Sequence, residues 1–123
     1  MTDTVLLVED ELFIALDLQQ TIEDAGFAVE GPCTSVGEAQ AAIDRAGRML
    51  AVALLDVRLP DGTVFPAADR LYASGVPLVF HSGHADDGEL RRRYPGALIC
   101  QKPSTPIDIV GALRQCTAGR TAA

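Results

Sequence analysis

The stretch AVALLDVRLPDG, residues 51–62, sets five apolar residues directly before Asp56 and ends in a Pro-Asp-Gly turn. A continuous apolar run of this length, bounded by a turn, is typical of a strand that is buried on both faces of a sheet. Asp56 then stands where the buried strand ends. Such a carboxylate belongs either to the turn itself or to a site at the edge of the sheet, and the other strands decide between the two.

Short apolar runs alternate with segments of helical period along the whole chain. The predicted strands are residues 5–8, 28–33, 51–55, 77–80 and 97–100. Strands that alternate with helices pair in parallel through right-handed crossovers, so helices cover both faces of the sheet. The sequence therefore predicts an α/β fold, a (βα)5 doubly wound three-layer sandwich.

The predicted helices carry start and stop signals. The first has an apolar stripe at spacings of three and four residues, formed by Leu12, Ala15, Leu18, Ile22 and Ala25. Gly26 follows it as a C-cap. Ser35 and Glu38 resemble a capping box at the start of the second helix. Thr105 with Pro106 opens the last helix.

Length and composition bound the remaining possibilities. The chain of 123 residues is sufficient for one compact domain, expected over residues 1–116, with a small, polar and disordered tail over 117–123. The apolar runs are far shorter than the roughly 18 residues of a membrane span, and none resembles a signal peptide, which predicts a cytoplasmic protein. The formal net charge of −7 disfavours direct binding to nucleic acid or to an anionic membrane.

Two smaller features have plain structural interpretations. The basic run 91–93 is expected in the last turn of a helix, where cations complement the helix dipole. The cysteines are widely spaced in apolar surroundings and are predicted to be reduced, buried thiols: Cys33, Cys100 and Cys116.

Chemically active residues follow four of the five predicted strands. They are Glu9, Asp10 and Glu11 after the first strand, Asp56 after the third, His81, Ser82 and His84 after the fourth, and Lys102 after the fifth. The carboxyl ends of parallel strands meet at one edge, where ligands bind. Gathered carboxylates repel one another unless a cation neutralises them, and Mg²⁺ suits a few carboxylates, waters and a phosphate oxygen. An aspartate placed there can attack phosphorus and form an aspartyl phosphate, while metal, lysine and hydroxyl stabilise the charge.

Four segments of the chain resemble the receiver domain of two-component response regulators. They are VLLVEDE (5–11), LLDVRLPDG (54–62), VPLVFHSGH (76–84) and QKP (101–103), and the resemblance extends over about residues 3–116. It implies a flavodoxin-like sheet of five parallel strands in the order 2-1-3-4-5. It also implies that Asp56 is a phosphoacceptor, with a histidine kinase or a phosphotransfer protein as the donor.

The same resemblance implies roles for the neighbouring residues. The direct Mg²⁺ ligands would be Asp10, Asp56 and the backbone carbonyl of Arg58, and Glu9 would act through water. Ser82 would be the hydroxyl that moves toward the phosphoryl group, and Lys102 would be its cationic partner.

The chain departs from the family pattern at three places. Ile99 stands three residues before the lysine. The family often has an aromatic side chain there, whose rotation reports phosphorylation, so we expect switching to be read out differently. Ser104 follows Lys-Pro where Phe is usual. Residues 63–84 resemble the FATGUY-type subgroup, many of whose members are stand-alone receivers. Its fourth strand reads Pro-Phe-x-Phe-Ala-Thr-Gly, and this chain matches in part, with PLVFHSG over 77–83.

Two residues beyond the strand ends are predicted to modulate the site. Arg58 and His84 lie two positions after Asp56 and Ser82, and we expect them to tune the phosphoryl lifetime by occluding or orienting the hydrolytic water. His81 and His84 make a poor metal site by their spacing, and His81 is interpreted as only a strand-end residue.

Two helices carry further predictions. The helix over residues 85–93 has only Ala85 and Leu90 as apolar residues and contains Gly88, so it is predicted to be weakly anchored and to shift or stiffen on phosphorylation. On the first helix, Phe13 lies opposite the core stripe and is predicted to seat the helix bundle of a kinase or phosphotransfer protein.

The leading hypothesis is a phosphoacceptor signalling switch that is not an enzyme beyond its own phosphorylation and dephosphorylation. It would act through a downstream protein or as a phosphate sink, as a monomer or a weak homodimer. Two alternatives stay open. A Mg²⁺-dependent phosphohydrolase of the haloacid-dehalogenase type also uses a strand-end aspartate, but it needs a second acid where Arg58 stands. A pseudo-receiver would never take phosphate and would not need the complete set of Glu9, Asp10, Asp56, Ser82 and Lys102.

Overall fold

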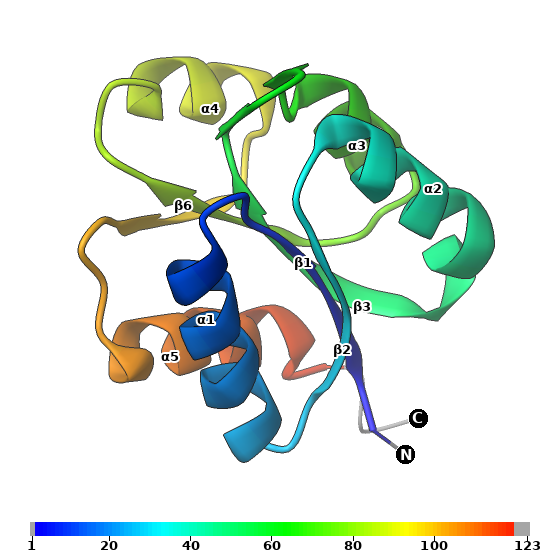
Figure 1. Cartoon of the computed structure of the whole chain (residues 1–123), viewed down its shortest axis with the longest axis vertical. Helices are drawn as coiled ribbons and strands as arrows, with labels where there is room; N and C mark the ends of the chain where they lie inside the picture. The colour runs from blue at the N-terminus through cyan, green and yellow to red at the C-terminus, as the bar shows by residue number, and fades with distance from the viewer. Residues whose placement is uncertain (1, 120–123) are drawn as a thin grey trace.

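The computed structural model describes residues 2–119 of the chain, which alternate between strands and helices (Figure 1). In chain order the elements are β1 (Thr4–Val8), α1 (Leu12–Asp24), β2 (Ala28–Cys33), α2 (Val36–Ala46), the 3₁₀ turn η1 (Gly47–Met49), β3 (Leu50–Asp56), β4 (Arg58–Leu59), β5 (Gly62–Thr63), α3 (Phe65–Ala73), β6 (Leu78–Ser82), α4 (Asp87–Arg93), β7 (Leu98–Gln101) and α5 (Pro106–Thr117).

Five parallel strands form one sheet in the order β2-β1-β3-β6-β7. Because β6 and β7 are its fourth and fifth strands along the chain, this is the order 2-1-3-4-5 that the sequence resemblance implies. The short strands β4 and β5 pair antiparallel on their own, in a small hairpin just after Asp56. The Pro-Asp-Gly pattern predicts only a turn there.

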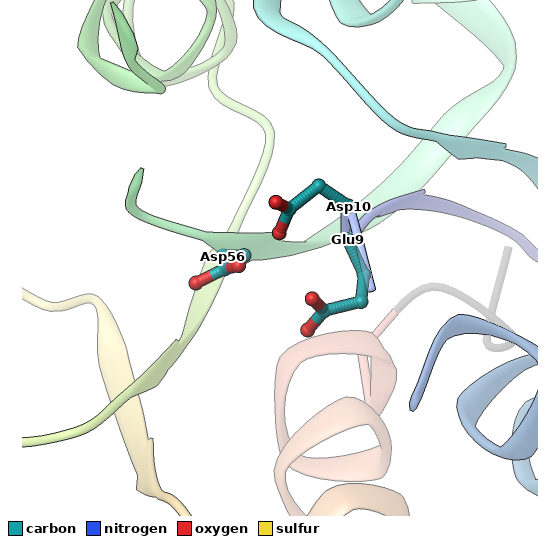
Figure 2. A group of neighbouring side chains, drawn as sticks. All are labelled: Glu9, Asp10 and Asp56. Carbon is teal, nitrogen blue, oxygen red and sulfur yellow. The ribbon is translucent and has the colours of Figure 1, made fainter. Parts of the chain in front are cut away.

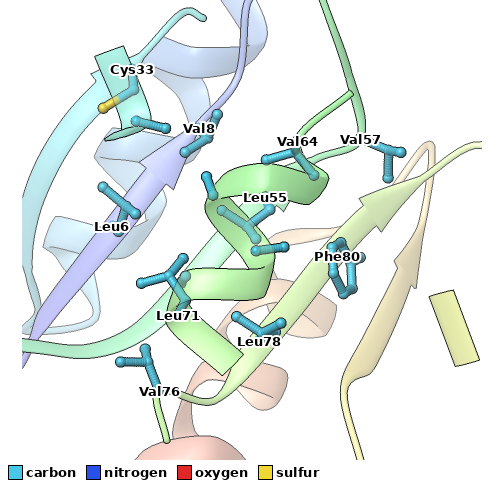
Figure 3. Close-up of a cluster of buried hydrophobic side chains, with 14 of the residues drawn as sticks. Leu6, Val8, Cys33, Leu55, Val57, Val64, Leu71, Val76, Leu78 and Phe80 are labelled. Carbon is cyan, nitrogen blue, oxygen red and sulfur yellow. The ribbon is translucent and has the colours of Figure 1, made fainter. Parts of the chain in front are cut away.

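Helices cover both faces of the sheet (Figure 1). One apolar cluster joins the sheet to α1 and α5 through Leu18, Ile22, Ile109 and Leu113. The other, drawn in Figure 3, joins the opposite face to α2, α3 and α4, and includes Leu6, Leu55, Leu71 and Phe80. All seven residues of β3 are buried, which confirms the prediction of a strand covered on both faces. This packing holds the end of β3, and therefore Asp56, in a fixed place.

The predicted stripe of α1 is right in its middle and departs at both ends, where Leu12 is exposed and Ala25 lies half-buried just after the helix. Ala15, Leu18 and Ile22 are buried, whereas the side chain of Leu12 is 60% exposed. Leu12 is the first residue of the helix, and its exposure shows that the prediction that it belongs to the core is wrong. Gly26 follows with a φ of 97°, the left-handed conformation expected of a glycine that ends a helix.

The predicted caps are present, one of them in an altered form. Thr105 and Asp108 form a complete capping box at the start of α5. At α2 the Ser35 hydroxyl accepts from the Glu38 amide, but the Glu38 carboxylate accepts from the backbone of Thr34 instead of Ser35. α5 includes Thr117, which the sequence analysis placed in the tail, and residues 120–123 of that predicted tail lie outside the described residues.

The cysteines are unpaired, as predicted. Cys33 and Cys100 are buried, and Cys116 is half-buried. Burial raises the pKa of the Cys33 thiol to about 11, with neighbouring carboxylates adding to the effect. The thiol is therefore protonated at neutral pH and packs as a small apolar side chain.

α4 is shorter than predicted and is anchored differently. Ala85 lies outside it and is exposed, and the buried apolar contacts come from Leu90 and from Tyr94, the residue after the helix. The Tyr94 hydroxyl donates to Asp69 on α3 at 2.6 Å. The three arginines 91–93 occupy the last turn, as predicted, and Arg93 stacks on the Phe65 ring at 4.1 Å. The C-terminal end of α4 is thus firmly held.

Candidate functional site

Three carboxylates gather at the carboxyl edge of the sheet. Glu9 and Asp10 directly follow β1, Asp56 is the last residue of β3, and these two strands pair side by side with Val8 opposite Leu55. One carboxylate oxygen from each acid lies within 4.8 Å of the others. Figure 2 shows Asp10 and Asp56 facing one another, with Glu9 beside them. Glu9 is 1% exposed and Asp56 9%, whereas Asp10 is exposed, so the cluster opens to solvent on the Asp10 side.

The burial of these acids changes how they ionise. Burial, with a contribution from the Glu9 charge, raises the pKa of Asp56 to about 6, and Lys102 only partly opposes this. Burial also acts to raise the pKa of Glu9, but the His81 ring, the Glu11 amide and Lys102 together bring it below its ordinary value. Glu9 is therefore the permanent charge of the pair, and Asp56 is the group that resists ionisation.

Lys102 follows β7 and reaches back to both acids. Its Nζ lies 3.1 Å from Asp56 Oδ1 and 3.6 Å from Glu9 Oε1. Its backbone amide donates to the Ser82 carbonyl at 2.7 Å, which fixes the lysine beside β6. Burial lowers the pKa of Lys102, but Asp56 and Glu9 outweigh this and leave it above its ordinary value. The side chain is therefore a cation at all physiological pH values.

Ser82 ends β6 and shares a cavity with Asp56. The cavity has a volume of about 310 Å³ and is lined by Asp56, Val57, Arg58, His81, Ser82, Gly83, Ala85, Asp86 and Lys102. The predicted phosphoacceptor, hydroxyl and lysine thus meet in one place. The Ser82 hydroxyl donates to Asp87 Oδ1 at 2.8 Å, and Gln101 donates to the other oxygen of Asp87.

Asp87 and Gln101 were missed by the sequence analysis. Asp87 is the first residue of α4, and an acid in that position is favoured by the helix dipole alone, so nothing in the sequence sets it apart. Gln101 was only part of the QKP motif. The contacts of Asp87 with Ser82 and Gln101 are a property of the assembled fold.

Arg58 and His84 lie at the rim of the site. The Arg58 guanidinium forms two hydrogen bonds to Asp86, of 3.2 Å from Nε and 2.8 Å from Nη2. His84 has a φ of 85°, unusual for a residue other than glycine, and its Nδ1 lies 3.6 Å from Asp87 Oδ2. Both side chains are 71% exposed. Arg58 lines the cavity of Asp56, but its charge is directed to Asp86.

His81 is more than a strand-end residue. It is 5% exposed, its Nδ1 lies 3.9 Å from Glu9 Oε1, and its Nε2 is 2.8 Å from Ser104 Oγ. Ser104, which stands where Phe is usual, therefore suits the histidine on β6, because its hydroxyl gives the buried ring a polar partner. Within residues 2–119 the only group of acids, cysteines and histidines that could hold a metal ion contains no histidine.

Phe13 stands at the border of a second cavity. It is 80% exposed on α1. The cavity, of about 470 Å³, lies between α1 and the segment that leads into α5, and is lined by Phe13, Ile14, Asp17, Leu18, Thr21, His81, Lys102, Pro103, Ser104, Thr105, Pro106 and Ile109. Lys102 and His81 thus lie between this cavity and the acids.

The chain was compared with known families, curated proteins and solved structures. No family model matches it. It is 27% identical over 117 residues to the phyllosphere-induced regulator PhyR of Methylorubrum extorquens, an alignment that covers 94% of this chain and 43% of PhyR. The chain thus spans less than half the length of that curated relative.

Solved structures of response regulators are also similar to this chain. A response regulator receiver protein from Sinorhizobium medicae is similar with a TM-score of 0.86 and 27% identity, over 97% of both chains. The response regulator PhyR from Brucella abortus is similar with a TM-score of 0.76 and 26% identity, over 95% of this chain and 48% of that one.

Two general consequences follow for the molecule. Receiver domains are signalling domains, which supports a phosphoacceptor role in signalling for this fold and this set of acids. Among the described helices, none combines the length and the apolar character needed to cross a membrane. By its fold, its strand-end residues and its structural neighbours, the chain is similar to the receiver domains of response regulators.

Proposed function

We propose that the chain is the phosphoacceptor switch of a two-component phosphorelay, with Asp56 taking a phosphoryl group from a histidine kinase or a phosphotransfer protein. The observation that carries the proposal is the position of Asp56. It ends the central buried strand, lies 3.1 Å from the Lys102 ammonium, and shares a cavity with the Ser82 hydroxyl.

The acid cluster fits a Mg²⁺ ion. It offers hard oxygen ligands from three carboxylates. Glu9 Oε1 is buried without a hydrogen bond, with Lys102 Nζ at 3.6 Å and His81 Nδ1 at 3.9 Å, and so has room to accept a hydrogen bond from a water on the ion. Asp10, Asp56 and the Arg58 carbonyl would hold the ion directly, and Glu9 would act through water. When bound, the ion would neutralise the charge that builds up on the phosphoryl oxygens.

The chemical step needs few groups. A carboxylate oxygen of Asp56 attacks the phosphorus of a phosphohistidine, a P–O bond forms, and the P–N bond breaks with its electron pair leaving on the imidazole nitrogen. Lys102 and the Ser82 hydroxyl are placed to stabilise the phosphoryl oxygens. The attack requires ionised Asp56, which burial and the Glu9 charge oppose and which a bound cation would favour.

The partner surface is proposed to include Phe13. Its exposed ring borders the apolar cavity beside α1 and is close in the chain to Glu9 and Asp10. A helix bundle that carries a phosphohistidine could cover this surface while reaching Asp56. The signal would pass to a downstream protein, or the domain would act as a phosphate sink. Location in the cytoplasm, the oligomeric state and membership of the FATGUY-type subgroup stay predictions.

The alternatives are weaker on the same geometry. A phosphohydrolase of the haloacid-dehalogenase type needs an acid two residues after its nucleophile, and Arg58 occupies that position with its charge paired to Asp86. A pseudo-receiver has no use for Lys102 placed against Asp56 at 3.1 Å.

Mass spectrometry tests the proposal. The protein is incubated with Mg²⁺ and phosphoramidate or acetyl phosphate, and then with candidate kinases. The wild type should gain one phosphoryl group, and Asp56→Asn should gain none. Asp24→Asn, an exposed aspartate at the end of α1, is the matched control and should behave as the wild type. Many turnovers of small phosphate esters would favour the phosphohydrolase, and no gain from any donor would favour the pseudo-receiver.

A further inference from the structure

The loop between β6 and α4 is built around the Ser82 hydroxyl. This oxygen donates to Asp87 Oδ1 at 2.8 Å and accepts from the His84 amide at 3.2 Å. The Asp87 amide in turn donates to the His84 carbonyl at 3.1 Å. The residue expected to contact a phosphoryl group therefore also holds the first residue of α4 in place.

The Asp87 side chain is buried, and both of its carboxylate oxygens accept hydrogen bonds. It is 8% exposed, and its second oxygen accepts from the Gln101 amide on β7. The side-chain oxygen of Gln101, Oε1, is buried without a hydrogen-bond partner. The carboxylate thus links the ends of β6 and β7 to the helix, and Ser82 supplies one of its few hydrogen-bond donors.

The two ends of α4 are held by different interactions. The N-terminal end depends on polar contacts, from Ser82 to Asp87 and from Arg58 to Asp86. The C-terminal end depends on buried Leu90 and Tyr94. A change at Ser82 therefore acts on one end of the helix only.

From this arrangement, and resting on the proposed function, we propose that Asp87 is the positioning residue of the Ser82 hydroxyl and transmits phosphorylation of Asp56 to the first turn of α4. A hydroxyl has one proton and donates it to one strong acceptor at a time. In the unphosphorylated chain that acceptor is Asp87. A phosphoryl group on Asp56 offers competing oxygens in the shared cavity, and Asp87 then loses the bond from Ser82 and releases the first turn.

The proposed coupling needs no aromatic side chain at position 99, where the chain has an isoleucine. Ile99 is half-buried and packs against the apolar cluster on the α3 and α4 face of the sheet. As an isoleucine, it has no hydroxyl or ring that could follow a movement of Ser82. The Asp87 side chain does not have to rotate for this coupling to work. Its carboxylate and the phosphoryl oxygens compete for the single proton of the Ser82 hydroxyl.

Hydrogen exchange on a set of variants tests the proposal. In the unphosphorylated protein, Ser82→Ala and Asp87→Ala should each speed amide exchange in residues 84–90 about tenfold, the effect of losing one charge-assisted hydrogen bond. The double variant should exchange no faster than either single variant, because both remove the same bond. Asp87→Asn should restore slow exchange, since its oxygen can accept from Ser82 and a turned Gln101 amide can accept from its nitrogen.

Glu89→Ala is the matched control. It removes an acid from the same helix, one that contacts only Arg92 and Arg93 among the ion pairs of α4, and it should leave exchange at residues 84–88 unchanged. Phosphorylation supplies a second readout. Asp87→Ala should be phosphorylated by phosphoramidate about tenfold faster than the wild type, because the hydroxyl no longer has to leave the charge-assisted bond to Asp87. This gain should vanish in the Ser82→Ala, Asp87→Ala double variant.

The outcomes separate this proposal from the proposed function. Mass is measured on the same samples, so failure of the wild type to gain a phosphoryl group counts against the function of Asp56 itself. A wild type that gains the phosphoryl group while residues 84–90 exchange as before overturns the role of Asp87 alone. Additive effects of Ser82→Ala and Asp87→Ala would overturn it as well.

Discussion

Replacing Asp56 with Asn should stabilise the metal-free protein. A carboxyl whose pKa is raised from 3.8 to about 6 on folding binds its proton more tightly in the folded chain. The folded state is then favoured at low pH, and this advantage is lost as the pH rises from 3.8 through 6. At 1.36 kcal/mol for each pKa unit, the cost of ionised Asp56 is about 2 to 3 kcal/mol above pH 7. Asn resembles the protonated acid and does not bear this cost.

Urea denaturation measures the effect. At pH 8 without Mg²⁺, Asp56→Asn should be more stable than the wild type by about 2 to 3 kcal/mol. The gain should shrink strongly at pH 4, where Asp56 is largely protonated in the folded state. The matched control Asp24→Asn, at an exposed position, should show no such pH-dependent gain. A loss of stability at pH 8, or an equal gain at both pH values, would refute the reasoning that burial and Glu9 oppose ionised Asp56.

Four further measurements test the site and the partner surface. Mg²⁺ should raise the unfolding temperature of the wild type in thermal denaturation, because a cation relieves the repulsion between the acids, and an equal rise in Asp10→Asn would contradict the ligand assignment. Lys102→Ala should slow phosphorylation by phosphoramidate about 100-fold, measured by mass, and a normal rate would exclude Lys102 as the stabilising cation. Arg58→Ala and His84→Ala should each change the rate at which the phosphoryl group is lost, and unchanged decay in both would retire their proposed role. Phe13→Ala should slow transfer from the cognate kinase but not from phosphoramidate, and normal transfer would remove Phe13 from the partner surface.

The fold could be predicted because its signals are local. The apolar run before Asp56 is buried on both faces whichever helix covers it, so its burial is readable from the run itself. The strand ends then locate Glu9, Asp56 and Lys102 at one edge, since parallel strands place their carboxyl ends together. Leu12 shows the limit of a periodic pattern, because the period marks a face of the helix but not where the sheet below it ends.

The contacts around Ser82 could not be predicted in the same way. The bond from Ser82 to Asp87 closes a loop whose backbone depends on the left-handed φ of His84, and a histidine carries no signal for that conformation. The burial of His81 against Ser104 also depends on two segments 23 residues apart in the chain. Polar pairs of this kind are set by tertiary packing, which neither composition nor period reports.

The aromatic anchor at Tyr94 limits how far α4 can carry a signal. With the Tyr94 hydroxyl held by Asp69, movement of the first turn is a tilt about the fixed C-terminal end. A helix of seven residues is about 10 Å long, so a tilt of about 10° displaces its first turn by roughly 2 Å. In the proposed switch, the helix would therefore tilt about its C-terminal end, which Tyr94 holds on the α3 side. A partner that distinguishes the two states would read them best at residues 84–88, because the displacement decreases along the helix toward its fixed end.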